Sequence, residues 1–308
     1  MDDASVFSSV KLCALCGEGF VPCQIGRHAG RETKRLRGIR GPNLLSRKNG
    51  IALMLGVAAG IAVLMLRLPP LPQSASYHHF ADQRGWLGIP NFWNVVSNVP
   101  FAVVGISGLA FIRHNAQSDV PRQTFIDPRE RWPYIGIFAG LVLTAFGSAY
   151  YHWATNNAHL VWDRLPMTIV FGSMVAALVV ERIGVEVGLK LLPIFVLIGA
   201  GSVLQWYWDE LHGHGDMRLY AAIQIYSALA LLLAMLLRPR YSGASAFVAV
   251  FGFYVLAKIF EETDRPIYAH GHVISGHTLK HVAVAAAGYW ILRMLQQRVP
   301  CPAEFIAR

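Results

Sequence analysis

Apolar segments of helical length follow one another along the chain, separated by shorter polar stretches. Six are nearly continuous and have roughly the 20 residues that a helix needs to cross the hydrocarbon core of a bilayer. Two further segments are weaker, because polar residues interrupt them. We therefore predict clear helices at 51–67, 94–112, 133–151, 161–180, 189–206 and 218–238, and weaker ones at 245–260 and 275–296.

The two weaker segments carry ionisable side chains at membrane depth. Residues 245–260 include Lys258, and residues 275–296 begin with the group His277, Lys280 and His281 before they become apolar. Hydropathy alone scores such segments low. Lipid cannot satisfy these side chains, so we expect them to face the interior of a helical bundle, where polar residues usually serve a function.

Composition supports a membrane protein. Of the 308 residues, 54% are hydrophobic and only 15% are charged, whereas a soluble domain carries about 25% charge. The mean hydropathy is +0.41. We predict an all-α polytopic membrane protein, in which the apolar segments form one bundle.

The distribution of positive charge predicts the orientation. With eight helices both termini share a side, and 20 of the 27 Lys and Arg residues lie on that side. The positive-inside rule then places both termini in the cytoplasm and the polar groups near residues 148–163 and 277–281 toward the outer face. The net charge of +9 is thereby explained by topology, so nucleic-acid binding is not inferred from it.

The two ends of the chain lie outside the bundle. Residues 1–48 are basic and lack apolar periodicity, so we expect a disordered cytoplasmic tail, and residues 297–308 form a second one. The pattern C-x2-C-x6-C-x4-H made by Cys13, Cys16, Cys23 and His28 could bind zinc. Its spacing fits no common zinc finger, and the alternative is a tail without metal. Cys301 is alone, so no disulfide framework is expected.

Two distant segments carry the candidate chemistry. His277 and His281 are four residues apart and project from one helix face, and Ser148 and His152 repeat that spacing on another helix. Asp163 begins the helix after a short loop, so it can return to the depth of His152. Three histidines with an open fourth position are common at catalytic zinc sites.

Other interpretations of these residues stay open. Ser148 could simply be a small packing residue, and Asp163 could cap a helix N-terminus. Histidines in the loops of the same face compete for a metal, most credibly His270 and His272. Further candidates in these loops, which we interpret as solvated, are His78, His79, His159, His212, His214, Glu261, Glu262 and Asp264.

Together these residues resemble the signature of the alkaline ceramidases. The signature consists of Ser148-x3-His152, Asp163 and His277-x3-His281. This family belongs to a superfamily of seven-helix membrane hydrolases that includes the adiponectin-receptor-like proteins. The segment from Asn91 to Asn98, Asn-Phe-Trp-Asn-Val-Val-Ser-Asn, is also similar to the start of the ceramidase core. The resemblance covers about residues 80–296.

The resemblance implies a fold, a cofactor and a reaction. It implies a seven-helix core at 80–296, with residues 49–68 as an additional transmembrane helix, and zinc held by His152, His277 and His281. It places Ser148 and Asp163 in the catalytic centre. The implied reaction hydrolyses the amide of ceramide-like lipids to a fatty acid and a sphingoid base.

The sequence departs from its eukaryotic relatives in one region. They carry an acidic calcium-binding cluster before the first core helix, whereas residues 80–91 contain a single acid, and Asn91 stands where an acid is expected. Calcium is therefore not expected as a cofactor. The compact loops suggest a bacterial-type member in the inner (plasma) membrane.

Our mechanistic hypothesis is metal-assisted amide hydrolysis, with Asp163 as general base and acid and Ser148 as a hydrogen-bond donor to the oxyanion. Two alternatives are a zinc-stabilised lipid receptor without turnover and a metal transporter. A transporter would need a polar path, but residues 282–292 are apolar apart from Tyr289. The natural lipid substrate, its acyl-chain preference and the oligomeric state are left open by the sequence.

Overall fold

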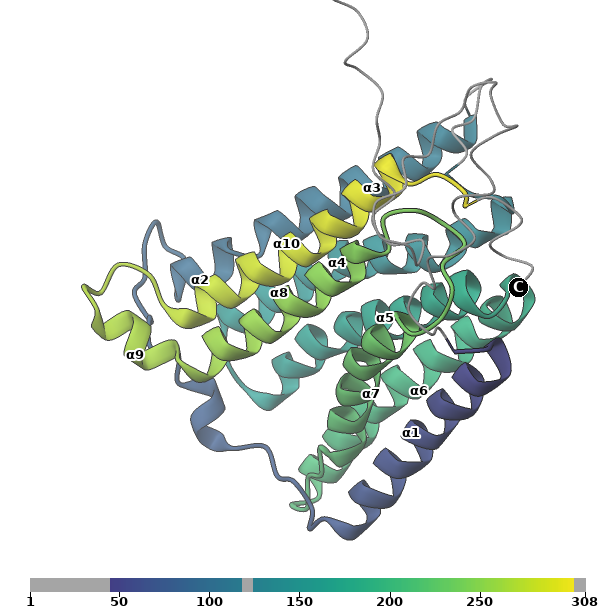
Figure 1. The fold of residues 1–308 in the computed structure, drawn as a ribbon. Coiled ribbons are helices and arrows are strands. Elements are labelled where there is room, and N and C mark those ends of the chain that lie inside the picture. Colours follow the sequence, from purple (N-terminus) through teal and green to yellow (C-terminus); the bar gives the residue numbers. More distant parts are fainter. Residues whose placement is uncertain (1–44, 118–123, 302–308) are drawn as a thin grey trace, which may run out of the picture.

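The computed structural model describes residues 45–117 and 124–301, and within these ranges the regular structure is helical (Figure 1). Each predicted apolar segment falls on a long helix. The long helices are α1 (Arg47–Arg67), α3 (Val99–Gln117), α4 (Arg131–Trp153), α5 (Asn157–Arg182), α6 (Val185–Leu211), α7 (Arg218–Ala234), α8 (Ser245–Glu262) and α10 (Gly276–Gln297). The short ones are η2 (Ala75–His78), α2 (Phe92–Val96), η3 (Pro128–Glu130) and α9 (Asp264–Ala269).

Five helical stretches of the described residues are long and apolar enough to cross a membrane, which is consistent with an integral membrane protein. They are 47–67, 92–117, 128–153, 157–182 and 185–211, with mean hydropathies between 1.4 and 2.2. Helix α7 is apolar but shorter. Helix α8 carries Lys258, Glu261 and Glu262, and α10 carries Lys280 and two buried histidines. Length and composition therefore do not test the predicted seven core helices and one additional helix, and this count stays a prediction.

The turn between α4 and α5 is tighter than the sequence suggested. Asn156 caps α5, because its side chain accepts a hydrogen bond from the amide of His159 at 2.9 Å, as asparagine does at helix N-termini. Helix α5 therefore begins at Asn157, and only residues 154–156 separate it from α4. The prediction that Asp163 begins this helix was wrong, since Asp163 lies in its second turn.

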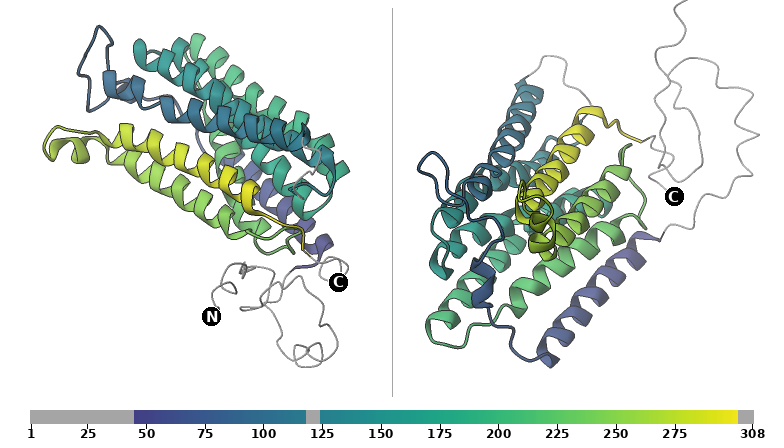
Figure 2. Two further views of the ribbon diagram at one scale, coloured as in Figure 1. Left: turned by 90° about the horizontal axis from the view of Figure 1, so that it is seen from above. Right: turned by 90° about the vertical axis from the view of Figure 1, so that its left-hand side faces the viewer.

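Close helix contacts bring the polar ends of the bundle together. Helix α4 packs between α3 and α5, and α10 packs between α3 and α8 (Figures 1 and 2). A side chain at Gly147 would collide with the backbone carbonyl of Trp162, and one at Gly276 would collide with that of Phe260. These glycines let α4 approach α5, and α10 approach α8, next to the residues predicted to carry chemistry.

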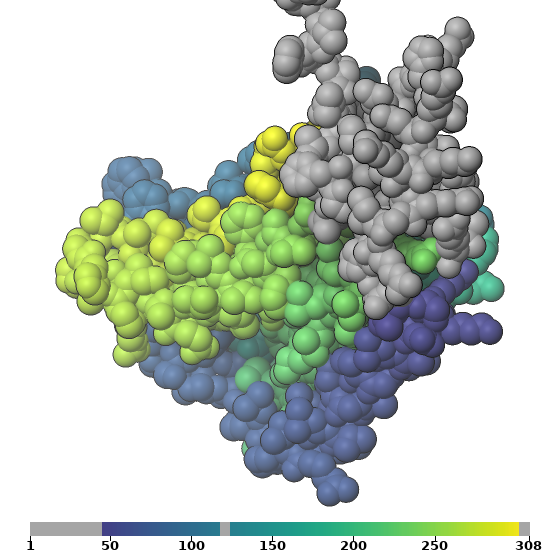
Figure 3. Space-filling view, in the orientation of Figure 1, coloured from purple at the N-terminus to yellow at the C-terminus, as the bar shows by residue number. Residues whose placement is uncertain are grey.

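The described chain ends and the candidate site lie at opposite ends of the bundle. The amide of Leu45 bonds to the carbonyl of Leu236, and that of Cys301 to the carbonyl of Arg240, so both chain ends meet the far end of α7. The opposite end holds α2, α9 and the start of α10 (Figure 2). Helix α1 runs along the rim of the molecule, and α8 and α9 cover a neighbouring side (Figure 3).

Candidate metal centre

Three histidines predicted to lie together do so at the polar end of the bundle. His152 comes from the last turn of α4, and His277 and His281 come from the first turns of α10. Their side chains are buried, and one candidate ligand nitrogen from each lies within 4.8 Å of the others. The group could hold a metal ion.

The start of α10 is fixed by two caps. Ser275 caps the helix, since its hydroxyl accepts a hydrogen bond from the amide of Thr278 at 3.2 Å. The carboxylate of Asp264 accepts the amide of His277 at 2.7 Å and the amide of Ala81 at 2.8 Å. Free amides at a helix N-terminus need such acceptors. The caps therefore hold His277 and His281, one turn apart, against the end of α4.

The spacing of the imidazoles suits a tetrahedral ion. Nε2 of His152 and Nε2 of His277 lie 3.2 Å apart. Two nitrogens bound to zinc at about 2.0–2.1 Å with tetrahedral angles would be ~3.3 Å apart. Neutral imidazoles suit zinc, copper, iron and nickel. The donor set therefore fits a transition metal.

Ser97 fixes the orientation of the His281 ring. Its hydroxyl lies 2.7 Å from Nδ1 of His281 and 3.2 Å from the backbone oxygen of Asn94. The carbonyl can only accept, so the Ser97 hydroxyl donates to it and accepts the proton on Nδ1. In that tautomer Nε2 of His281 is unprotonated and can bind a metal. Metal-binding histidines commonly donate their other ring N–H to such a partner, which fixes the tautomer.

The asparagine-rich segment before α3 supports both helix ends. Asn91 has a left-handed backbone with φ of 46° and donates its side-chain amide to the backbone oxygen of His152 at 2.9 Å. Asn94 accepts a hydrogen bond from Thr278 at 3.2 Å and donates to the backbone oxygen of Asp82 at 3.0 Å. This segment, singled out in the sequence by resemblance, therefore joins α4, α10 and the loop that precedes it.

Ser148 and Asp163 are buried together beside the histidines. Their side chains approach each other across the α4–α5 contact at Gly147. Arg164 turns away from Asp163, since its guanidinium donates to the Gln73 side chain at 2.5 Å and lies 4.4 Å from the centre of the Trp206 ring. The predicted role of Ser148 toward the substrate stays a prediction.

A cover segment, residues 75–84, lies over the histidines. The Phe80 ring sits 4.7 Å from the ring of His152 and 4.4 Å from that of His277. Burial raises the pKa of the Tyr77 hydroxyl, which stays protonated and donates to Glu261 at 3.4 Å. His78 bonds to the Tyr151 hydroxyl at 2.9 Å. Side chains of the cover segment thus separate the metal group from the aqueous side of the bundle.

Two acids that were predicted to be solvated in loops are structural. Glu261 lies in α8 and forms ion pairs with Lys258 at 2.5 Å and Lys280 at 2.6 Å, and Asp264 caps the start of α10. The interpretation of both as solvated loop acids was wrong, because the sequence did not reveal that α8 and α10 pack together here. Glu262 is exposed.

The competing histidines are not part of the metal group. In the part of the chain that the structure describes, only His152, His277 and His281 form a group able to hold a metal. The side chains of His212 and His270 bond to the backbone carbonyls of Trp208 and Pro266 in their own turns. The group Cys13, Cys16, Cys23 and His28 lies outside the described residues. Both side-chain oxygens of Asp82, the single acid of residues 80–91, accept hydrogen bonds from the guanidinium of Arg84.

An apolar cavity of about 80 Å³ lies in the bundle below the metal group. It is lined by α4, α5, α7, α8 and α10, and Val284, one turn beyond His281, forms part of its wall. Leu141 and Val170 line it from the helices that carry Ser148 and Asp163. The polar centre and the apolar cavity therefore share the same helices.

Comparison with models of known protein families and with curated protein sequences finds no match to this chain. The resemblance to the alkaline ceramidases thus rests on the residues of the signature. The assignment of an activity rests on them and on the arrangement of the side chains described above.

Proposed function

We propose that the chain is a zinc-dependent intramembrane amide hydrolase that cleaves ceramide-like lipids to a fatty acid and a sphingoid base. The observation that carries this proposal is the buried group of three imidazoles beside the paired Ser148 and Asp163. Three protein ligands with an open position are typical of catalytic rather than structural zinc. The resemblance to the alkaline ceramidases assigns the same five residues to one centre.

Each residue has a defined role in this proposal. His152, His277 and His281 would hold zinc, which when bound supplies a Lewis acid for the amide carbonyl and allows water to attack near neutral pH. Asp163 accepts the proton of the attacking water and delivers it to the leaving nitrogen. Ser148 releases Asp163 and donates to the carbonyl oxygen as negative charge develops there.

The surroundings of the centre favour a lipid substrate. The centre lies at the polar end of the bundle, and the apolar cavity below it begins one turn beyond His281. A lipid amide at the histidines would direct its acyl chain toward that cavity, where apolar burial contributes about 0.8 kcal/mol for each CH₂ group that enters it. Calcium and nucleic acid have no part in the proposal.

The proposed placement in the membrane follows the charge distribution. We assign α2 with α3, and α4, α5, α6, α7, α8 and α10, to a seven-helix core, and α1 to an additional transmembrane helix. The protein would lie in a bacterial plasma membrane with both termini in the cytoplasm and the metal group toward the outer face.

Turnover of labelled lipids tests the proposal. The purified full chain, loaded with zinc, is incubated in detergent with ceramide, phytoceramide or dihydroceramide, and released fatty acid and bound zinc are measured in parallel. We expect wild type to hydrolyse at least one of them. Asp163→Asn should retain zinc but lose turnover, because asparagine keeps the shape of aspartate and cannot act as a base. Asp209→Asn, the same change on α6, serves as the control.

Two outcomes would contradict parts of the proposal. If zinc-loaded wild type hydrolyses no amide lipid, the hydrolase is excluded and a lipid receptor of the same fold takes its place. If Asp163→Asn turns over at a near-normal rate, the reaction stands and the assignment of the base is wrong.

A further inference from the structure

Helix α1 is fixed to α7 at both ends. At its beginning the amide of Leu45 donates to the carbonyl of Leu236 at 2.8 Å, and Gly50 allows the helix to touch Leu237. At its end the guanidinium of Arg218 donates to the backbone oxygens of Met65 at 3.0 Å and Leu68 at 2.6 Å. The position of α1 is therefore defined, although few of its residues are buried.

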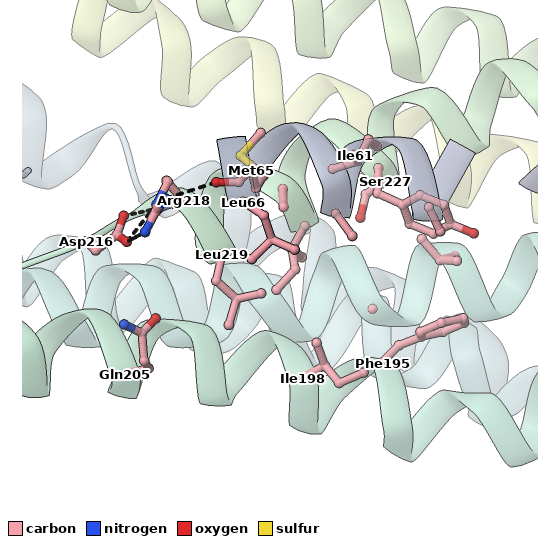
Figure 4. Close-up of a pocket in the computed structure, with 17 residues that line it drawn as sticks. Ile61, Met65, Leu66, Phe195, Ile198, Gln205, Asp216, Arg218, Leu219 and Ser227 are labelled. Atoms are coloured by element: carbon pink, nitrogen blue, oxygen red, sulfur yellow. Dashed lines mark hydrogen bonds and ion pairs between the residues drawn. The ribbon is translucent and has the colours of Figure 1, made fainter. Parts of the chain in front are cut away.

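Between these two attachments α1 stands away from α5 and α6 and leaves a groove. The groove has a volume of about 600 Å³, within the range of about 300–1,000 Å³ that is usual for small-molecule sites. Its walls are mostly apolar, and Figure 4 shows Gln205, Asp216 and Arg218 toward one end and Ser227 toward the other. The end formed by the first three of these residues lies on the same side of the bundle as the metal group, because the end of α6 meets the α4–α5 turn, where the side chain of Asn157 donates to Glu210 at 2.9 Å.

The length of the groove corresponds to one leaflet. Its wall on α1 runs from Ala58 to Leu66, and its wall on α7 runs from Arg218 to Ser227. At 1.5 Å per residue these stretches are about 12 and 14 Å long. Half of a hydrocarbon core of about 30 Å is roughly 15 Å. The groove thus reaches from the polar level of Arg218 to near the middle of the bilayer.

We propose that this groove is a lipid site, which holds one hydrocarbon chain of a bilayer lipid from the leaflet on the metal-group side. The groove is continuous with the lipid-facing surface, because Leu66 and Ile198 both line it and are 81% and 49% exposed. The bilayer that covers this surface therefore supplies the occupant. The site is independent of the proposed hydrolysis, and the lipid in it is not the substrate.

A helix of a second copy is the competing occupant of this apolar groove, which has a volume of about 600 Å³, and the labelling experiment distinguishes it from a hydrocarbon chain. The polar end sets the depth of the head group without selecting its charge, because Arg218 and Asp216 already pair at 2.7 Å. The hydrocarbon chain is accordingly the part of the lipid that is recognised.

Photo-labelling of the reconstituted full chain tests this site. The probe is a phosphatidylcholine with a diazirine in the middle of one acyl chain, and the labelled peptides are identified by mass spectrometry. We expect labelling to concentrate on residues 58–66 and 219–227. Ala62→Phe, which narrows the groove, should reduce this labelling at least fivefold. Gly60→Phe is the matched control, since a side chain at Gly60 meets nothing within 4 Å.

Zinc content and thermal unfolding of both variants establish that they are folded. Labelling spread evenly over the exposed faces of α1 would refute the site. So would equal labelling of Ala62→Phe and Gly60→Phe, or labelling of the groove residues below that of the rest of α1, which a second copy seated in the groove would produce. None of these readouts depends on turnover, so the lipid site and the proposed hydrolase can fail separately.

Discussion

Removal of the Ser97 hydroxyl should weaken zinc binding without touching a ligand. In Ser97→Ala the proton on Nδ1 of His281 loses the acceptor that lies 2.7 Å away. A buried donor left without a partner costs about 1–3 kcal/mol. Loss of a partner that orients a metal-binding histidine typically lowers metal affinity about 10–100-fold. At about 1.4 kcal/mol per factor of ten, this loss agrees with the cost of the unpaired donor. We therefore expect the Kd for zinc to rise ~10–100-fold.

Chelator competition on the purified full chain measures this Kd directly. Ser202→Ala on α6 is the matched control, because the Ser202 hydroxyl is also buried and also donates to a carbonyl three residues earlier, that of Gly199. It touches no histidine of the metal group. The reasoning is refuted if Ser97→Ala binds zinc as tightly as wild type, or if Ser202→Ala loses as much affinity.

Three further predictions concern packing, pH and orientation. Gly147→Ala should lower Tm and disturb the centre, since overpacking costs about 1–3 kcal/mol. Gly201→Ala is the control, because the space around Gly201 is free, and equal Tm values for the two variants would contradict the prediction. Burial raises the pKa of Asp216, but hydrogen bonds from Arg218 outweigh burial, so the pKa lies below its usual value of 3.8. The ionised carboxylate therefore stabilises the fold above pH 3.8, and this stabilisation is lost as the pH falls through the lowered pKa. Asp216→Asn should therefore reduce Tm more at pH 7 than at pH 3, and a constant difference would exclude this linkage. In a background without native cysteines, an external thiol reagent should label His214→Cys and spare Gln117→Cys, and the reverse would overturn the predicted topology.

The sequence was sufficient where local spacing determines geometry. His277 and His281 share a face because they are four residues apart on one helix, and His152 joins them because its segment ends at the same depth. Long apolar segments likewise predicted the long helices, including α8 and α10, which hydropathy alone scores low. The ceramidase-like activity follows from resemblance and stays a prediction.

The sequence was insufficient where contacts join distant segments. Ser97 and His281 are separated by 184 positions, and Glu261 becomes an ion-pair partner only because α8 and α10 pack together. Phe80 lies in a loop whose path over the histidines no local pattern reveals. The start of α5 was misplaced for a different reason. The prediction followed the apolar residues, whereas the side chain of Asn156 caps the helix several residues earlier.

The contact between α1 and α7 has a consequence for synthesis of the protein. Met65 and Arg218 are separated by 153 positions, so at about 5–20 residues per second α1 waits roughly 8–30 s for its partner. During that time it must reside in lipid without α7, and its mean hydropathy of 2.2 is the highest of the five spans. Helix α10, which carries His277, Lys280 and His281, is made last among the described helices. It emerges when the helices that receive its polar side chains are already present.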